Sequence, residues 1–262
     1  MRAKLALAAC AALLTSGAGL AVAREDAPPS AQKGYLAAGA LDTSKVLAPA
    51  PRPGEARYDA DRKTFLASRA LKDSPRWTLA QADVDEKKIL ADFGCALGFA
   101  PTPETTPRLV ALLMKLRYDV RDAVNKPKDL YRRQRPYLID EGPICVDKTA
   151  DLAASPDYPS GHTTWGWTVG LILAELDPEH ATAILVRGRS YGESRVVCGV
   201  HNASAIEAGR TNASALVAAL HGSKAFRDDL DAVRAEIASA RAKAAKPAQC
   251  DVESALVAQT PY

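Results

Sequence analysis

The residues Tyr158-Pro159-Ser160-Gly161-His162-Thr163-Thr164 form the stretch around which this chain is organised. Pro159 disfavours helix at the residue before it, and Gly161 can adopt backbone angles that are closed to other residues. We therefore expect a loop that turns into a helix at this point. The backbone N–H groups at the start of such a helix are ready to bind an anion.

Two further blocks carry cations and a second histidine. They read Lys128-Asp129-Leu130-Tyr131-Arg132-Arg133-Gln134-Arg135-Pro136 and Ser194-Arg195-Val196-Val197-Cys198-Gly199-Val200-His201-Asn202-Ala203-Ser204-Ala205. Seven residues are about two helical turns, so Lys128 and Arg135 project from one face if their segment is helical. Together with Arg195, these cations, the loop of N–H donors and the two histidines suit a phosphoryl group.

The order and internal spacing of the three blocks carry a resemblance. Lysine, six residues and Arg-Pro; Pro-Ser-Gly-His; and Ser-Arg, five residues and His are similar to the signature of the PAP2 superfamily. From about Arg57 to Arg241 the chain resembles a bacterial class A non-specific acid phosphatase. Each block alone is a weak signal, whereas the three together are a strong one.

The resemblance implies a role for each matching residue. His201 corresponds to the nucleophile that becomes a phosphohistidine, and His162 corresponds to the general acid. The implied phosphate ligands are Lys128, Arg135, Arg195, Ser160 and the backbone amides of Gly161 and His162. The resemblance also implies broad specificity for phosphate monoesters, with no metal and no other cofactor.

One position departs from the family pattern. The family places an aspartate four residues after the last histidine, where it orients the nucleophile, and this chain has Ala205 there. Alanine cannot accept the imidazole N–H that fixes the tautomer. Ser204 and Glu207 are not obvious substitutes, so another group orients the ring, the enzyme is slow, or the residue was changed by engineering.

Other activities stay open at this point. Ala205 is compatible with an inactive relative or a periplasmic phosphate-binding protein. A vanadate-dependent haloperoxidase shares the signature, although such proteins are typically much longer. Lipid-phosphate phosphatases share the site as well, but they need spanning helices, and no segment after residue 23 approaches eighteen uninterrupted apolar residues.

The first residues are typical of a secretory signal peptide. Arg2 and Lys4 precede an apolar run over 5–14, and the small residues Ala21-Val22-Ala23 suggest cleavage after residue 23. Their removal lowers the formal net charge from +3 to +1. We expect an exported periplasmic protein that binds neither nucleic acid nor membranes through bulk charge.

Four cysteines remain after that cleavage: Cys95, Cys145, Cys198 and Cys250. An even number in an oxidising compartment makes two disulfides plausible, and three connectivities are possible. We favour Cys95 with Cys145 and Cys198 with Cys250. A zinc site is disfavoured because no C-x-x-C pair exists.

Helical periodicity and punctuation predict a single all-α domain without strand-like alternation. We expect helices over 57–71, 79–90, from Pro107 capped by Thr106, 165–176, 179–197, 204–220 and 223–243, with Pro127 starting another. Residues 138–158 should form a long loop that borders the site. The predicted organisation is a signal peptide over 1–23, an extended or disordered Pro-rich arm over 24–56, and the phosphatase domain over 57–262.

Some polar and aromatic residues receive structural interpretations. The charge run Asp83, Asp85, Glu86, Lys87 and Lys88 most simply forms a solvated helix face. Arg132 and Arg133 are expected to be surface charges, and His180 and His221 to be structural. Tyr131, Tyr137 and Tyr158 could form a rim for organic phosphates, although packing in the core is equally plausible. The expected partners are small phosphate monoesters, inorganic phosphate and a second copy of the chain in a homodimer or larger oligomer.

Overall fold

The computed structural model describes residues 33–244, 247–248 and 250–262, so the predicted signal peptide lies outside the described residues. The described part is helical and contains no strand, which confirms the all-α prediction. The α-helices are α1 (Ala56–Ser68), α2 (Pro75–Ala82), α3 (Ile89–Asp92), α4 (Gly94–Leu97), α5 (Pro107–Tyr131), α6 (Ala150–Ala154), α7 (Gly161–Leu176), α8 (Ala181–Val197), α9 (Ala203–Leu220), α10 (Lys224–Arg241) and α11 (Cys250–Val257). Short 3₁₀ turns are η1 (Thr43–Lys45), η2 (Arg69–Leu71), η3 (Glu86–Lys88), η4 (Pro136–Leu138) and η5 (Pro178–His180).

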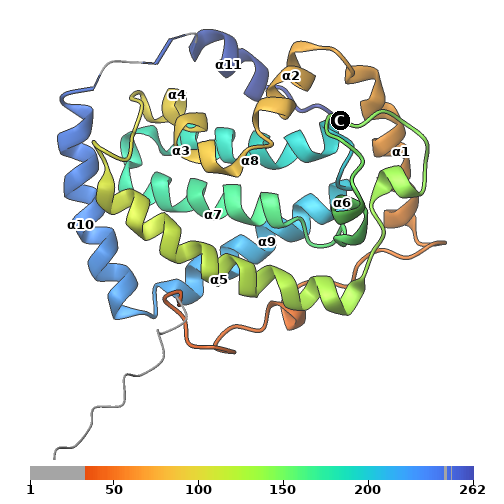
Figure 1. Ribbon diagram of the computed structural model, residues 1–262, viewed down its shortest axis with the longest axis horizontal. Coiled ribbons are helices and arrows are strands. Elements are labelled where there is room, and N and C mark those ends of the chain that lie inside the picture. Colours follow the sequence, from red (N-terminus) through yellow and green to blue (C-terminus); the bar gives the residue numbers. More distant parts are fainter. Residues whose placement is uncertain (1–32, 245–246, 249) are drawn as a thin grey trace, which may run out of the picture. The chain divides into compact units, whose positions relative to one another are not determined.

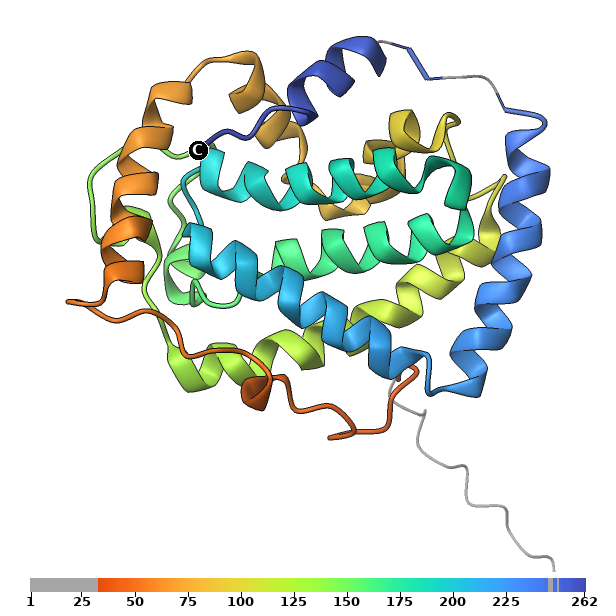
Figure 2. The same cartoon turned by 180° about the vertical axis from the view of Figure 1, so that it is seen from behind.

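Helix α7 lies at the centre and packs most extensively on α8 and α9. Figure 1 shows α7 and α8 side by side, with α5 running obliquely below α7 and α10 at one edge; α9 crosses behind α5 in this view and in front of it in Figure 2. The two central helices approach each other at a pair of glycines. A Cβ built at Gly170 would lie 3.5 Å from the Cα of Gly188. The side chains between α5, α7, α8 and α10 form the main core.

Helix α5 begins at Pro107 as predicted and continues beyond Pro127, where a new helix was expected. Thr106 is the N-cap residue but makes no side-chain capping bond, and the Glu236 carboxylate from α10 accepts from the backbone N–H groups of Arg108 and Leu109 at 2.9 Å each. Pro127 lies inside α5 and does not begin a new helix, so that prediction was wrong. The helix ends at Arg132, whose φ of 43° is left-handed.

The predicted helix over 79–90 was also wrong, because the chain breaks into α2, η3 and α3. The break follows Asp83, which is fully buried and ion-paired with Arg187 of α8. Asp85, Lys87 and Lys88 are exposed as predicted, but they lie at the η3 turn and not on one helix face, and Asp83 is not part of a solvated surface. This turn carries Glu86 towards the centre of the molecule.

The two disulfides differ from the favoured pairing. Cys95 is joined to Cys250 and Cys145 to Cys198. The fold brings residue 145 beside the end of α8, where its N–H donates to the carbonyl of Cys198 at 3.0 Å. Cys95, in α4, instead lies next to the start of α11.

The described part of the predicted arm, residues 33–55, lies along α5 and α9 (Figure 2). The backbone N–H groups of Tyr35 and Leu36 donate to Asp119, and the Thr43 hydroxyl donates to the carbonyl of Ala123 at 2.6 Å. Further along, side chains of the arm pack in a small apolar cluster with the Tyr158 loop and α9. Its members are Leu47, Ala50, Tyr158, Ala205 and Ala208.

Within the described part of the chain, no helix combines the length and the hydrophobicity that crossing a membrane requires.

Candidate active site

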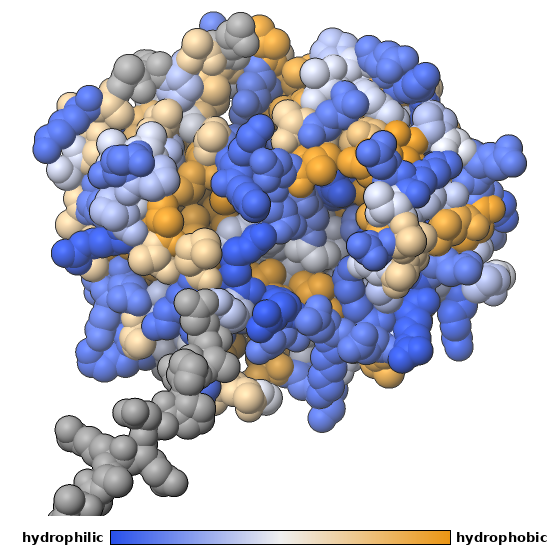
Figure 3. All heavy atoms as spheres, viewed as in Figure 1, coloured by the Kyte–Doolittle hydropathy of each residue, from blue (hydrophilic) through white to orange (hydrophobic). Residues whose placement is uncertain are grey.

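A cavity of about 580 Å³ opens between α5, the start of α7 and the end of α8. Six of the predicted site residues line it: Lys128, Arg135, Gly161, His162, Arg195 and His201. The remaining lining residues are Glu86, Met114, Arg117, Tyr118, Val120, Arg121, Val124, Asn125 and Trp165. Figure 3 shows hydrophilic residues gathered in the middle of the face seen in Figure 1, between hydrophobic patches.

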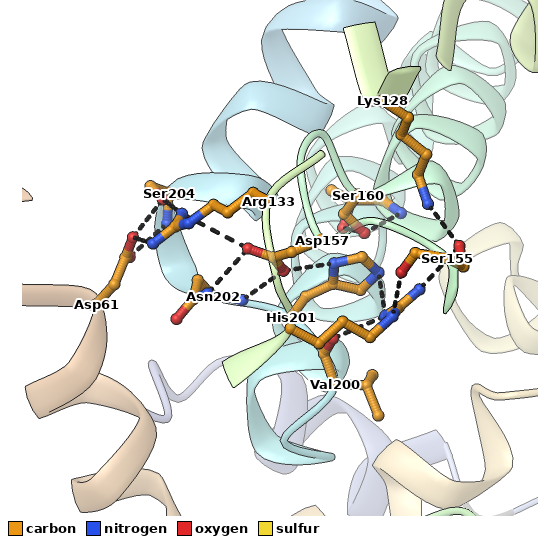
Figure 4. A network of polar contacts seen from close by, with 12 residues as sticks. Asp61, Lys128, Arg133, Ser155, Asp157, Ser160, Val200, His201, Asn202 and Ser204 are labelled. Atoms are coloured by element: carbon orange, nitrogen blue, oxygen red, sulfur yellow. Dashed lines mark hydrogen bonds and ion pairs between the residues drawn. The ribbon is translucent and has the colours of Figure 1, made fainter. Parts of the chain in front are cut away.

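His201 is buried at the turn that follows α8. Gly199, with a φ of 81°, lets the chain turn sharply two residues earlier. Nδ1 of His201 lies 2.9 Å from Oδ1 of Asp157, and its Nε2 lies 3.2 Å from a guanidinium nitrogen of Arg135 (Figure 4). A carboxylate accepts only, so Nδ1 carries the proton and Nε2 keeps its lone pair towards the cations.

Asp157 is a candidate functional residue that the sequence analysis missed. Besides Nδ1 of His201, its oxygens accept from the backbone N–H of Asn202 at 3.1 Å and the side-chain amide of Asn202 at 2.8 Å. Burial raises the pKa of Asp157, against the opposing effects of Arg133 and Asn202. A carboxyl group directly before the Tyr-Pro-Ser-Gly-His block was the signal that could have identified it.

A buried ion-pair network holds Asp157 in place. Arg133 lies 3.5 Å from Oδ2 of Asp157 and 2.8 Å from Asp61 of α1 (Figure 4). Its carbonyl also accepts from the Asp157 N–H at 2.8 Å, and Asp61 accepts from the backbone N–H of Ser204 at 2.9 Å. The prediction that Arg133 is a surface charge was wrong, because the helix end at Arg132 turns the next side chain inward. Arg132 itself is exposed as predicted.

The three predicted cations converge on His201 from two helices and a loop. Lys128 is on α5 and Arg195 on α8, whereas Arg135 follows the end of α5 and does not share its face with Lys128. Ser155 links Lys128 to Arg135, because its hydroxyl is 3.1 Å from the Lys128 ammonium and 3.2 Å from the Arg135 guanidinium. The carbonyl of Ser155 accepts from Nε of Arg135 at 2.8 Å.

The electrostatics of this cluster favour a bound anion. Burial, followed by the charge of Arg135, lowers the pKa of Lys128 to about 8, and burial lowers that of Arg195 to about 10. Burial and the cations Arg135, Lys128 and Arg195 hold the pKa of His201 well below 6.5. Nε and Nη1 of Arg195 are buried without a hydrogen-bond partner among the described residues. An anion in the cavity would supply acceptors for them.

The Pro-Ser-Gly-His turn forms the N-terminus of α7, as the sequence predicted. Ser160 is the N-cap residue, and its Oγ accepts from the N–H of Thr163 at 3.2 Å and from the Thr163 hydroxyl at 2.9 Å. Its own N–H donates to the carbonyl of Ala205 at 3.0 Å. Ser160 therefore supports the turn and is absent from the cavity wall, while Gly161 and His162 reach it.

His162 lines the same cavity as His201 and is held by groups from two other elements. Its Nδ1 lies 3.1 Å from Oε1 of Glu86, and its ring stacks on Tyr191 with centroids 4.4 Å apart. Glu86 was predicted to belong to a solvated face, and that prediction was wrong because η3 points it into the cavity. No pattern in the sequence around Glu86 or Ser155 indicated a site.

Other predicted residues lie away from the cavity. Tyr131, Tyr137 and Tyr158 do not line it, and Tyr158 packs in the apolar cluster under the arm. His180 pairs with Asp177 and His221 with Glu175, both outside the cavity wall. The described residues contain no group of three or more His, Cys, Asp or Glu side chains arranged to hold a metal ion.

Comparisons with known proteins identify similar sequences. A family model described as PAP2 superfamily matches residues 109–227. The chain is 41% identical over 209 residues to an acid phosphatase of Zymomonas mobilis, which covers 79% of each protein. It is 34% identical over 203 residues to a non-specific acid phosphatase of Providencia stuartii (76% of this chain, 82% of the relative), and 31% identical over 222 residues to one of Salmonella typhimurium (83% and 89%).

Proposed function

This chain belongs to the PAP2 superfamily and is a phosphoric monoester hydrolase of the acid phosphatase kind, and we propose that it works through a phosphohistidine on His201. The observation that carries the proposal is the environment of this imidazole. Its Nδ1 is bonded to buried Asp157, and its Nε2 lies among three cations. The missing carboxylate at position 205 therefore does not argue for an inactive phosphate binder.

In the first step, the lone pair of Nε2 attacks phosphorus. The P–N bond forms as the P–O bond to the alcohol breaks, and protonated His162 gives its Nε2 proton to the departing oxygen. Lys128, Arg135 and Arg195 stabilise the phosphoryl oxygens throughout, with the arginine forks orienting them and the lysine acting as a point charge. The depressed pKa of His201 keeps the nucleophile unprotonated in acid.

In the second step, water attacks the phosphorus of the phosphohistidine. His162, now neutral, takes a proton from this water, the P–N bond breaks, and inorganic phosphate leaves. Both histidines return to their starting protonation states. Because His162 must begin each cycle protonated and its pKa is lowered by burial and Arg195, we expect an acidic optimum.

The shape and lining of the cavity support broad specificity. The phosphoryl group occupies the cationic end, which leaves most of the 580 Å³ for the alcohol. The outer wall combines apolar Met114, Val120 and Trp165 with the polar Arg117, Tyr118, Arg121 and Asn125, so alcohols of different polarity find contacts there. Residues 1–23 and the two disulfides support export to an oxidising compartment, which we propose to be the periplasm.

Trapping the intermediate tests this proposal. A radiolabelled phosphate ester is mixed with the enzyme and quenched in alkaline denaturant, because phosphohistidine hydrolyses in acid. We expect label on His201 of the wild type, none on His201→Ala, and a loss of about 10⁴-fold or more in kcat for that variant.

His221→Gln, which changes a histidine outside the cavity, is the matched control and should keep the label and the rate. Full phosphate release by His201→Ala, or turnover of the wild type without a labelled enzyme at any quench time, would exclude the phosphohistidine mechanism.

A further inference from the structure

His162 also has a carboxylate partner, Glu86, which comes from a different part of the chain than Asp157. The turn η3 is held by the Asp85 side chain, which accepts from the N–H of Lys87 at 3.1 Å, and it places Glu86 at the cavity. Oε1 of Glu86 is 3.1 Å from Nδ1 of His162, and Oε2 is 2.7 Å from a guanidinium nitrogen of Arg117. The carboxylate is therefore held from two sides.

Two contacts, with Glu86 and with Tyr191, fix the orientation of the His162 ring. The Glu86 carboxylate contacts Nδ1, and the Tyr191 ring stacks on one face of the imidazole with an interplanar angle of 4°. Gly166 leaves room for the Tyr191 ring at this position. A Cβ at position 166 would lie 2.2 Å from the Tyr191 ring. Nε2 of His162 is left buried at the cavity, with no hydrogen-bond partner among the described residues.

The charges around His162 oppose one another. The facing groups are Glu86 of η3, Arg117 of α5, Tyr191 and Arg195 of α8, buried Asp83, and His201. Burial and Arg195 disfavour a protonated ring, whereas Glu86 and Asp83 favour it. The hydrogen bond to His162 and the nearby cations also outweigh burial at Glu86 and lower its pKa. The carboxylate thus remains charged beside the imidazole.

We propose that Glu86, fixed by Arg117, is the positioning residue that keeps His162 protonated at Nε2 and aimed at the leaving-group oxygen. The inference rests on the proposed role of His162 as general acid. It assigns the site two carboxylate–imidazole pairs, Asp157 with His201 for attack and Glu86 with His162 for proton transfer. The alternative is that the Glu86–Arg117 ion pair only stabilises the fold.

A leaving-group series separates these alternatives. An acid matters most when the departing alkoxide is basic, so kcat/KM for alkyl phosphates depends on the proton more than kcat/KM for p-nitrophenyl phosphate does. Glu86→Gln keeps an acceptor without its charge, and Glu86→Met removes both. We expect a loss of about tenfold or more on alkyl phosphates, part of the 100-fold or larger contribution of a general acid, with a much smaller loss on p-nitrophenyl phosphate.

Three further measurements complete the test. The alkaline limb of the kcat/KM profile should move to lower pH in Glu86→Gln, and Arg117→Met should show the same selectivity to a lesser degree. Lys87→Gln, on the same turn but exposed, is the matched control and should behave as wild type. A uniform loss on all esters, or no loss in folded Glu86 variants, would overturn the proposal.

His162→Ala identifies which inference has failed. If His162→Ala is leaving-group selective and the Glu86 variants are not, the positioning role is wrong and the acid role stands. If His162→Ala is not selective either, the general-acid assignment fails first. Thermal melts of each variant show whether a loss of rate reflects unfolding.

Discussion

At Asp157, two carboxylate oxygens accept from three N–H donors, and one of these donors is Nδ1 of His201. The imidazole is thereby held in the tautomer that has its proton on Nδ1 and its lone pair on Nε2. Arg133 and Asp61 extend the arrangement into a buried network that ties α1 to the start of α9. In the proposed mechanism, the attacking tautomer therefore depends on Arg133 and Asp61, which do not line the cavity.

Replacing Asp157 by asparagine tests that dependence. An amide turned to donate towards Nδ1 would place the imidazole proton on Nε2, which then has no lone pair for phosphorus. We expect kcat to fall by roughly 10²- to 10⁴-fold, the upper figure being the cost of the equivalent change in a serine-protease triad. Steady-state rates on p-nitrophenyl phosphate check this, and a loss below tenfold would contradict it.

Introducing the aspartate of the family at position 205 should not help. Nδ1 of His201 already has its acceptor, and Ala205 is fully buried in an apolar cluster. We expect Ala205→Asp to leave kcat unimproved and to lower the free energy of unfolding by about 3–5 kcal/mol, the cost of leaving a buried charge uncompensated. Denaturant unfolding and initial rates measure the two effects, and a faster variant would show that Asp157 is an incomplete substitute.

Because burial lowers the pKa of Lys128 to about 8, we expect the affinity of the cavity for an anion to fall in mild alkali. The ammonium loses its proton as pH rises through this value, whereas an arginine stays charged. We expect Ki for tungstate, a tetrahedral dianion that stays ionised in this range, to rise up to about tenfold for each pH unit above 8. In Lys128→Arg the profile should stay flat, and a parallel rise in both proteins would assign the titration to another group.

At the scale of the helices, the site depends on how closely α7 and α8 approach. Gly166 of α7 lies under the Tyr191 ring of α8, and this ring supports His162. Gly170, one turn later, faces Gly188 at an ordinary contact distance. The two glycines of α7 therefore differ in their surroundings. Gly166 makes space for an aromatic ring, whereas Gly170 lies against the backbone of α8.

Gly166→Ala should displace Tyr191 and with it the His162 ring. A Cβ only 2.2 Å from the ring must move it, and such overpacking costs about 1–3 kcal/mol. We expect a lower melting temperature together with a lower kcat. Gly170→Ala is the matched control and should lose less of both, so equal losses in the two variants would argue against a special role for the stack.

Local patterns predicted the long helices and the three blocks, but they missed the short helices α6 and α11 and what long-range contacts decide. Helical periodicity after Pro107 was enough for the start of α5, and the Pro-Ser-Gly-His turn was enough for the start of α7. Pro127 looked like a boundary, yet packing carries the helix through it. Glu86 gave no signal because its partner is 76 residues away in the sequence.

Across the whole molecule, the two disulfides have unequal relations to the site. Cys145–Cys198 fastens the loop before Asp157 to the end of α8, three residues before His201. Cys95–Cys250 joins α4 to α11, whose Glu253 lies 3.2 Å from Arg187. One crosslink therefore supports the walls of the cavity, while the other closes the C-terminal end of the chain.

Removing each disulfide by paired alanine substitution should separate stability from catalysis. Both variants should lose about 2–4 kcal/mol in the free energy of unfolding, a typical cost for crosslinks that close long loops. Only Cys145→Ala/Cys198→Ala should also reduce kcat/KM, because only it loosens the segments that bear His201 and Asp157. Equal kinetic losses in the two variants would refute this division.

The position of Asp157 in the sequence also affects how related sequences should be classified. A survey that demands aspartate four positions after the second histidine would discard this protein as a pseudoenzyme, although its imidazole has a carboxylate partner. The compensating signature is compact: an acidic residue directly before Tyr-Pro-Ser-Gly-His together with a small apolar residue at the vacated position. Sequences that carry both features belong among candidates for biochemical screening.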